Sequence, residues 1–310
     1  MAPKDRLVRF LLRRGAAALI LVFAVTSGAL LLAQLAPGDF ASQIGRTPAE
    51  IAAERARLGL DRPFLERYAE WLRRSATLDL GESFQYQRPV TELVGAAARN
   101  TALLASCALV LATLLGIPWG VITGTQRGLA AAALRAMSLL LLSVPPLISS
   151  LVLLTVAART GWLPVSGMGT VRHLIVPTLA LALPIAALLE RFQSSAMADS
   201  MSRPSTSAAR ARGVPEARVI WRHGWRQSLA PVLGIYGVVV GSLFSGSFAV
   251  ESVTSWPGLG ALMLQALMSR DMYLVAGCAA AGSAFLAAGI LAADVVHAVA
   301  DPRVTLEDAR

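Results

Sequence analysis

Long apolar runs separated by short basic loops are the feature that most constrains what this chain can fold into. Most of these runs are long enough to cross a hydrocarbon layer as a helix. Soluble domains carry about 25% charged residues. Here 15% of the 310 residues are charged and 55% are hydrophobic. The predicted fold class is therefore an all-α membrane protein with six transmembrane helices, at about residues 15–36, 100–123, 134–158, 174–189, 229–250 and 273–300.

The loops between these runs predict the topology. Cytoplasmic loops of membrane proteins are enriched in arginine and lysine. Arg127 and Arg135 flank the turn after the second run, and a strongly basic stretch follows the fourth. The basic N-terminus lies on the same side as these loops, and six spans return the C-terminus to that side. Both termini are therefore predicted to be cytoplasmic.

The chain is expected to divide into four parts. The first run is longer than the roughly 7–15 residues of a cleaved secretory signal, which predicts a retained span. The polar second part carries mixed charge and two short helical patterns. The four parts are a tail and first span at 1–36, an extracytoplasmic segment at 37–99, a five-helix core at 100–300 with a cytoplasmic loop at 190–228, and a tail at 301–310.

The charge and rare residue types exclude several classes of protein. A net charge of +9 would suggest nucleic acid in a soluble protein, but retained cytoplasmic arginines explain it here, and no nucleic-acid partner is predicted. Lys4 is the one lysine, so a phosphate-binding loop of the G-x-x-x-x-G-K-[ST] kind cannot be built. Two cysteines, Cys107 and Cys278, and three scattered histidines have no metal-site spacing. Neither a metal nor an enzyme active site is expected.

Small residues and prolines inside the runs predict how the helices pack. Gly116, Gly120 and Gly124 recur at four-residue steps, and Gly237 is paired with Gly241. This small-xxx-small spacing favours close helix–helix contact in lipid. Kinks or breaks are predicted at the prolines inside the runs: Pro118, Pro145, Pro146, Pro177 and Pro184.

The basic stretch AARARGVPEARVIWRHGWRQ, residues 208–227, has a local structure of its own. Good helix formers end at Gly213, where a left-handed cap is expected, and Pro215 with Glu216 is typical of the first turn of another helix. Arginines at 218, 222 and 226 form one predicted stripe, and tryptophans at 221 and 225 form its neighbour. Three interpretations compete: a charge anchor, a nucleic-acid-binding loop, and a docking surface for a protein. Only docking accounts for the glycine turn between two helices.

Asp294 and His297 support a different function. They are spaced i, i+3 near the end of the last run, and ionisable groups inside membranes are expensive and often functional. One alternative is therefore a proton-coupled secondary transporter that uses these two residues as a relay. The simpler interpretation places both at the cytoplasmic interface. A membrane scaffold without transport is a third possibility, but it leaves the broken spans unexplained.

Ala208, Ala209 and Gly213, with three residues between the last two, resemble the cytoplasmic "EAA" loop of ABC importer permeases. The continuation VIWRHGWRQSLAP, with His223 and Pro231, resembles the dipeptide/oligopeptide/nickel branch of that family. Further blocks agree in the same order along the chain: LAPGD (35–39), LGLDRPF (58–64), LDLGES (78–83), NTALL (100–104), SVPPL (143–147), GWLPVSG (161–167), VESVTSWPGLG (250–260) and DPRV (301–304). Two departures occur in the loop. Pro204, Ser205 and Thr206 replace the usual Asp-Tyr-Val, and Ser207 stands where the general motif has glutamate.

The resemblance implies a type I ABC importer permease fold in a bacterial inner membrane, crossing the bilayer several times. It implies half of a translocation pathway, completed by a second homologous permease, powered by two ABC ATPase subunits and supplied by an extracytoplasmic solute-binding protein. ATP would be bound by those partners, so this chain would need no cofactor of its own. Peptides are the favoured solutes, with nickel and opine-like solutes left open. The residues implied in ATPase coupling, within a loop at 205–226, are Ala208, Ala209, Arg210, Arg212, Gly213, Val214 and His223.

Overall fold

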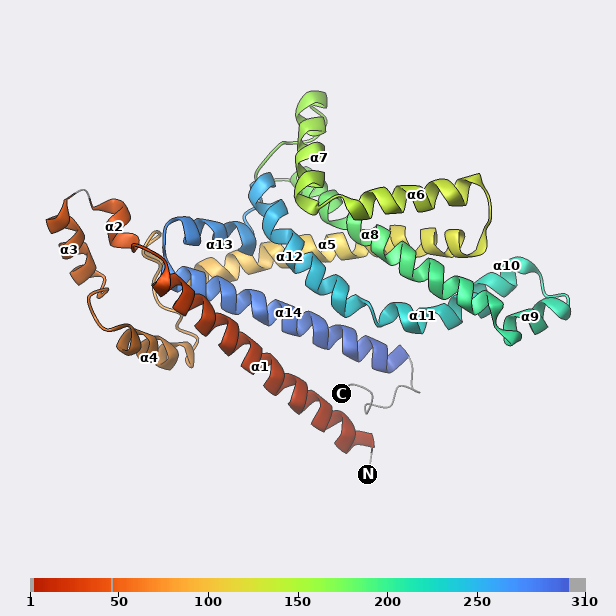
Figure 1. Cartoon of the computed structure of the whole chain (residues 1–310), viewed down its shortest axis with the longest axis horizontal. Helices are drawn as coiled ribbons and strands as arrows, with labels where there is room; N and C mark the ends of the chain where they lie inside the picture. Colours follow the sequence, from red (N-terminus) through yellow and green to blue (C-terminus); the bar gives the residue numbers. More distant parts are fainter. Residues whose placement is uncertain (1–2, 46, 301–310) are drawn as a thin grey trace. The chain divides into compact units, whose positions relative to one another are not determined.

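The computed structural model describes residues 3–45 and 47–300, with side chains from 12 to 295 except residue 46. The described part contains helices joined by turns and loops, and its one β feature is an isolated bridge between Glu82 and Pro89, which confirms the all-α class. The elements, most of them labelled in Figure 1, are α1 (Pro3–Leu35), α2 (Phe40–Ile44), α3 (Pro48–Arg57), α4 (Phe64–Ser75), α5 (Val90–Thr125), α6 (Leu129–Ser143), α7 (Pro146–Thr160), α8 (Val171–Ser202), α9 (Pro204–Ala211), α10 (Glu216–Arg218), the π-helix η1 (Val219–Gly224), α11 (Trp225–Leu233), α12 (Tyr236–Thr254), α13 (Leu259–Met268) and α14 (Met272–Ala300).

Five helices in the described part are long and apolar enough to cross a membrane, and a bent pair makes a sixth if it counts as one span. The five are α1 from Leu12, α5, α8, α12 and α14. The bent pair is α6 and α7, which meet at 104°. The number of predicted spans is therefore matched only when this pair is counted as one.

The span predicted at 134–158 is broken at the Pro145–Pro146 pair, which confirms the break predicted at these prolines. The residue before a proline is pushed out of the helical region, and proline itself donates no backbone hydrogen bond. Val144 accordingly has extended backbone, with φ −96° and ψ 117°, and Pro146 occupies the first turn of α7. By contrast, Pro118 lies inside α5, and Pro177 and Pro184 lie inside α8, so these prolines do not end their helices.

The span predicted at 229–250 is also divided. α11 ends at Leu233, and α12 begins at Tyr236 after a short break at Gly234 and Ile235. In the predicted extracytoplasmic segment there are three short helices, α2, α3 and α4, rather than two. α5 already begins at Val90, before the predicted end of that segment.

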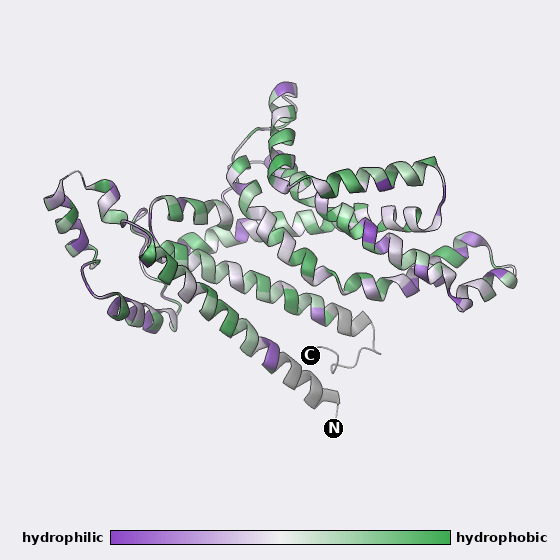
Figure 2. Ribbon diagram, in the orientation of Figure 1, coloured by the Kyte–Doolittle hydropathy of each residue, from purple (hydrophilic) through white to green (hydrophobic). Residues whose placement is uncertain are grey.

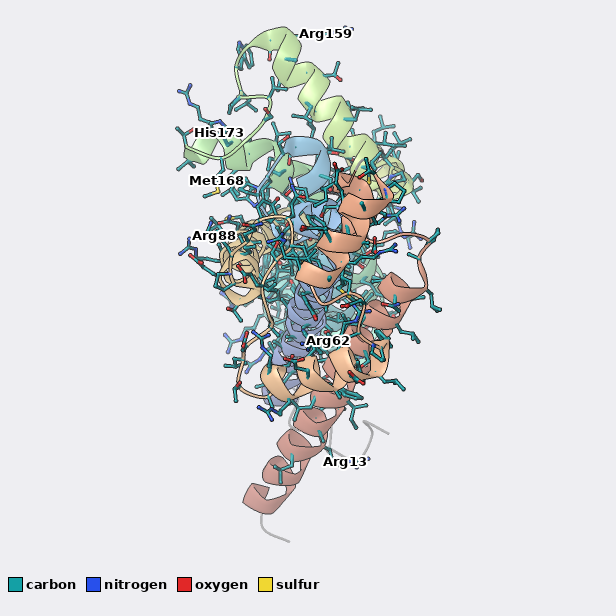
Figure 3. All side chains as sticks on the ribbon, turned by 90° about the vertical axis from the view of Figure 1, so that its left-hand side faces the viewer. Arg13, Arg62, Arg88, Arg159, Met168 and His173 are labelled. Carbon is teal, nitrogen blue, oxygen red and sulfur yellow. The ribbon has the colours of Figure 1, made fainter. Side chains whose placement is uncertain are left out.

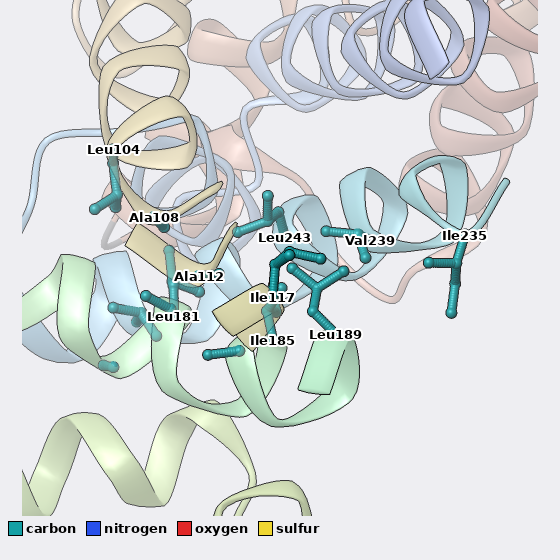
Figure 4. Packing of buried hydrophobic residues seen from close by; sticks show 14 of the residues in the cluster. Leu104, Ala108, Ala112, Ile117, Leu181, Ile185, Leu189, Ile235, Val239 and Leu243 are labelled. Carbon is teal, nitrogen blue, oxygen red and sulfur yellow. The ribbon is translucent and has the colours of Figure 1, made fainter. Parts of the chain in front are cut away.

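The chain separates into two compact units, and the first comprises mainly residues 103–256 and 288–300. Its hydrophobic core is built by α5, α8 and α12, which interdigitate in Figure 4. α6 and α7 both pack on α8. The labelled core residues are Leu104, Ala108, Ala112 and Ile117 from α5, Leu181, Ile185 and Leu189 from α8, and Ile235, Val239 and Leu243 at or near α12.

The row of glycines on α5 makes the close contact that its spacing predicts. A β-carbon added at Gly116 would lie 2.8 Å from the β-carbon of Leu189. At Gly120 it would lie 2.7 Å from the carbonyl oxygen of Glu190, and at Gly124 2.7 Å from the β-carbon of Met197. All three contacts are on α8, so α5 and α8 approach more closely than any other side chain would allow.

The second unit comprises residues 13–102 and 257–287. Aromatic rings of its core contact one another in tilted geometry, with the Phe84 ring centroid 5.7 Å from that of Phe40 and 5.2 Å from that of Tyr273. Asp271 is fully buried and joins the 81–87 segment to α14. Its carboxylate accepts hydrogen bonds from the Ser83 hydroxyl at 2.6 Å and from the backbone N–H groups of Gln85 and Leu274, each at 3.1 Å.

Hydrophilic and hydrophobic residues are concentrated on different helices, as expected of a membrane protein. Hydrophilic residues gather on α3, α4 and around α9 and α10, whereas the long helices are predominantly hydrophobic (Figure 2). In the first unit, Arg159 lies at the end of α7 and His173 at the start of α8 (Figure 3). His173 and Thr170 form a reciprocal cap there, with the Thr170 N–H donating to Nδ1 at 3.2 Å.

Candidate functional site

The candidate site is loop 203–228, defined as residues Arg203 to Ser228, which leads from α8 through α9, α10 and η1 into α11 (Figure 1). Pro204 sets its beginning. Arg203, the residue before it, has extended backbone with φ −68° and ψ 147°, so α8 ends at Ser202 and Pro204 starts α9. The departure from the family pattern at Pro204 is therefore a helix restart.

Gly213 closes α9 in the left-handed conformation that the sequence predicts. Its φ is +75°, which costs glycine little and strains other residues. The Val214 N–H donates to the carbonyl oxygen of Ala209 at 3.2 Å, and the Gly213 N–H donates to that of Arg210 at 2.9 Å. This is the paired hydrogen bonding of a Schellman cap. A β-carbon at Gly213 would meet no atom within 4 Å, so the turn is open to its surroundings.

An ion pair joins the two arms of the turn, which are α9 before Gly213 and the α10–η1–α11 segment after it. The Arg210 guanidinium donates to both carboxylate oxygens of Glu216, at 2.7 Å and 3.0 Å. The hydrogen bond from Arg210 lowers the pKa of Glu216, and the same bond raises the pKa of Arg210. The two side chains are 40% and 55% exposed. Water screens the pair at that exposure, so it contributes at most about 1 kcal/mol to holding the turn.

The second arm contains a π-helical turn that the sequence does not predict. Its buried positions are Val219, Gly224 and Ser228, spaced five and then four residues apart. A regular α-helix would instead bring residues three or four apart onto one face. A β-carbon at Gly224 would lie 2.7 Å from the Met197 side chain of α8, so the extra residue brings a glycine to this close contact.

The predicted arginine and tryptophan stripes lie on the outer side of this arm. Arg218, Arg222 and Arg226 are all exposed. Trp221 and Trp225 remain neighbours, with ring centroids 5.8 Å apart.

Three hydrogen bonds, two buried and one exposed, attach loop 203–228 to α8 and to itself. The Thr206 hydroxyl donates to the carbonyl oxygen of Ser200 at 2.8 Å, where both side chains are buried. The Gln193 amide donates to the Ser228 hydroxyl at 2.8 Å. The Gln227 amide donates to the Ser205 hydroxyl at 3.2 Å, which ties α11 to the start of α9. Both ends of the loop are therefore attached to α8.

The residues singled out from sequence occupy different places in this loop. Ala208 and Gly213 are exposed and present a small-surfaced tip, flanked by the exposed Arg210 and Arg212. Val214 and His223 are half-buried. Ala209 is fully buried, so its small size allows α9 to pack closely within the chain and does not shape the outer surface.

Glu190 and Gln193 are functional candidates that the sequence reasoning missed. Both are fully buried on α8, facing the glycine row of α5, and the Thr123 hydroxyl donates to Oε1 of Glu190. The signal was available, because polar residues spaced i, i+3 just after an apolar run mark a polar stripe on a helix that is otherwise buried in protein or lipid. Gln193 also donates to Ser228 at the end of loop 203–228, whereas Glu190 joins α8 to α5.

Comparison with known proteins identifies the family. Residues 116–306 match the family described as "Binding-protein-dependent transport system inner membrane component", and residues 7–105 match the corresponding N-terminal family. The chain belongs to this family. A Brucella ovis protein provisionally named a peptide permease is 32% identical over 96% of this chain and 99% of its own length. The oligopeptide transport system permease protein AppB of Bacillus subtilis is 30% identical over 95% of this chain and 98% of its own length. The dipeptide transport system permease protein DppB of Lactococcus lactis is 30% identical over 97% of this chain and 100% of its own length.

The permease is thus a multi-pass protein of the bacterial inner membrane that forms a translocation pathway. It is the permease subunit of an ABC system that also contains a solute-binding protein and ATPases. Family membership gives no support to the proton-coupled alternative. Asp294 lies half-buried in α14, and the side chain of His297 is outside the described residues, as is the tail at 301–310.

Proposed function

We propose that the permease forms half of the pathway of an ATP-driven peptide importer and is coupled to its ATPases by loop 203–228. A second homologous permease completes the pathway, and two ATPase subunits bind and hydrolyse the ATP, so this chain holds no cofactor. Its termini and loop 203–228 face the cytoplasm. Its extracytoplasmic segment meets the solute-binding protein.

One observation carries the coupling proposal. The exposed tip is made of Ala208 and the open turn at Gly213, while the arms behind it are tied to α8 by Thr206 and Gln193. A small tip fits a groove of another protein, and rigid attachments transmit the movement of that groove. Closure of the ATPases would then displace α8 and, through the glycine contacts, α5, as expected for rigid-body switching between two states.

Substitutions at Gly213 test this proposal and separate bulk from strain. Gly213→Trp has room within the chain but fills the tip, so we expect it to reach the membrane and abolish solute-stimulated ATP hydrolysis in the reconstituted complex. Gly213→Ala is the matched control, because it introduces the same positive-φ strain of roughly 1 kcal/mol with little bulk. It should retain most of the stimulation. Stimulation of wild-type size in Gly213→Trp would refute coupling through this tip.

The peptide substrate is supported by the names of the relatives AppB and DppB. It is tested by uptake of a labelled dipeptide, a labelled pentapeptide and Ni²⁺ into vesicles that contain the complete transporter with its solute-binding protein. We expect ATP-dependent uptake of one or both peptides. Uptake of Ni²⁺ alone would refute the peptide assignment while leaving the coupling proposal intact.

A further inference from the structure

A basic cleft of about 430 Å³ lies among α5, α6 and α8 in the first unit. It is lined by Arg127 from the turn between α5 and α6, Arg135 from α6, and Arg191 from α8. Arg127 and Arg191 stand just beyond the ends of two predicted spans, where a helix meets the lipid headgroups. The cleft thus presents three guanidinium groups, two of which lie at predicted ends of membrane spans.

The positive charge of this cleft is not neutralised within the described residues. Its acidic lining residue is Glu190, which is fully buried and accepts a hydrogen bond from Thr123. Arg135 donates to the backbone carbonyl oxygen of Gln126 at 3.0 Å. None of the three arginines forms an ion pair with a carboxylate in the described part, whereas Arg55, Arg57, Arg62, Arg74, Arg88 and Arg210 all do. Three guanidinium groups and one carboxylate give the cleft a net positive charge, which favours the binding of an anion.

An apolar surface adjoins the cleft on α6. Leu139 lines the cleft itself and is 50% exposed, and its neighbour Leu140 is 64% exposed. In a membrane-spanning pair of helices, such leucines face acyl chains. α6 therefore carries both the Arg135 guanidinium, which lines the cleft, and exposed leucines that can contact acyl chains.

We propose that this cleft binds the phosphate group of an anionic phospholipid. Guanidinium groups recognise phosphate oxygens through paired, charge-assisted hydrogen bonds, and basic pockets between membrane helices suit lipid headgroups. The exposed leucines favour a lipid over free phosphate, because a free ion would use only the arginines. The site is independent of which solute is transported and of how loop 203–228 is engaged. It would link lipid composition to the α5–α8 contact.

The test uses the purified transporter complex in detergent and follows its thermal unfolding during titration with phosphatidylglycerol, phosphatidylcholine or inorganic phosphate. Phosphatidylglycerol should stabilise the wild type, and R127Q/R191Q should weaken its apparent affinity about tenfold or more. These two arginines are chosen because their side chains make no hydrogen bond in the described structure that the substitution would break. The control R13Q/R159Q removes the same charge from exposed arginines elsewhere and should titrate like the wild type.

Each contrary outcome overturns the proposal. Equal stabilisation by phosphatidylcholine would mean that charge is not recognised. The same effect from inorganic phosphate would assign the site to a free anion. An equal loss in R127Q/R191Q and R13Q/R159Q would reduce it to general surface charge. An unchanged lipid titration in R127Q/R191Q with a raised KM for solute would place the cleft in the solute pathway instead.

A variant too unstable to purify is replaced by R127K/R191K, which keeps the charge but loses paired donation and should bind phosphatidylglycerol more weakly than the wild type.

Discussion

Gly120→Ala is expected to destabilise the permease, although alanine is the better helix former. Gly120 lies in α5 against α8, and an added β-carbon would lie 2.7 Å from the carbonyl oxygen of Glu190. Ordinary contact begins at 3.4 Å, so two helix backbones must separate by several tenths of an ångström. The β-carbon of Gln193 is in the way as well, which leaves no flexible side-chain end to give way.

The net magnitude follows from two opposing effects. Overpacking a tight contact costs typically about 1–3 kcal/mol. Replacing glycine by alanine inside a helix regains roughly 0.5–1 kcal/mol. We therefore expect a net loss of stability of about 1–2 kcal/mol. Separation of α5 from α8 would also lengthen the hydrogen bond between Thr123 on α5 and Glu190 on α8. Because movement is proposed to pass from α8 to α5, solute-stimulated ATP hydrolysis should weaken too.

Gly95→Ala is the matched control, since Gly95 lies in the same helix and its β-carbon would meet nothing within 4 Å. It should be neutral or stabilising. The assay is thermal unfolding of the detergent-solubilised complex, followed by tryptophan fluorescence, with wild type and both variants measured side by side. Equal or higher unfolding temperatures for Gly120→Ala than for Gly95→Ala would refute the close-packing argument.

Two further predictions concern polar contacts. Asp271→Ala should lower stability by about 3 kcal/mol, because it removes a buried carboxylate that accepts three hydrogen bonds, whereas Ser83→Ala removes one bond and should cost less. Proteolysis of the extracytoplasmic segment measures this, and equal sensitivity of the two variants would contradict it. Because Arg210 lowers the pKa of Glu216 below its ordinary value of 4.5, the stabilisation of the turn is present above that pH and is lost as the pH falls through the lowered pKa. Glu216→Gln should abolish this acid dependence in hydrogen exchange of loop 203–228, and an unchanged profile would exclude the ion pair as its cause.

Several features of the fold could be predicted from neighbouring residues alone. The apolar runs predict helices because the bilayer requires backbone hydrogen bonds to be made within the segment. Gly213 predicts a left-handed cap because the conformational preference of glycine is local. The four-residue spacing of Gly116, Gly120 and Gly124 predicts a close helix contact, although it does not name α8 as the partner.

Tertiary structure decided the rest, because burial depends on groups distant in sequence. The Pro145–Pro146 pair marks a break, but packing of α6 and α7 on α8 sets the 104° angle between them. The π turn at Val219–Gly224 arises where Gly224 must meet Met197, a contact that no local pattern contains. Likewise Ala209 belongs to a motif readable from sequence, yet only its surroundings make it a packing residue while Ala208 stays exposed. The sequence by itself determined which segments are helical and where the loop turns. The tertiary structure decided which of their side chains are presented to a partner.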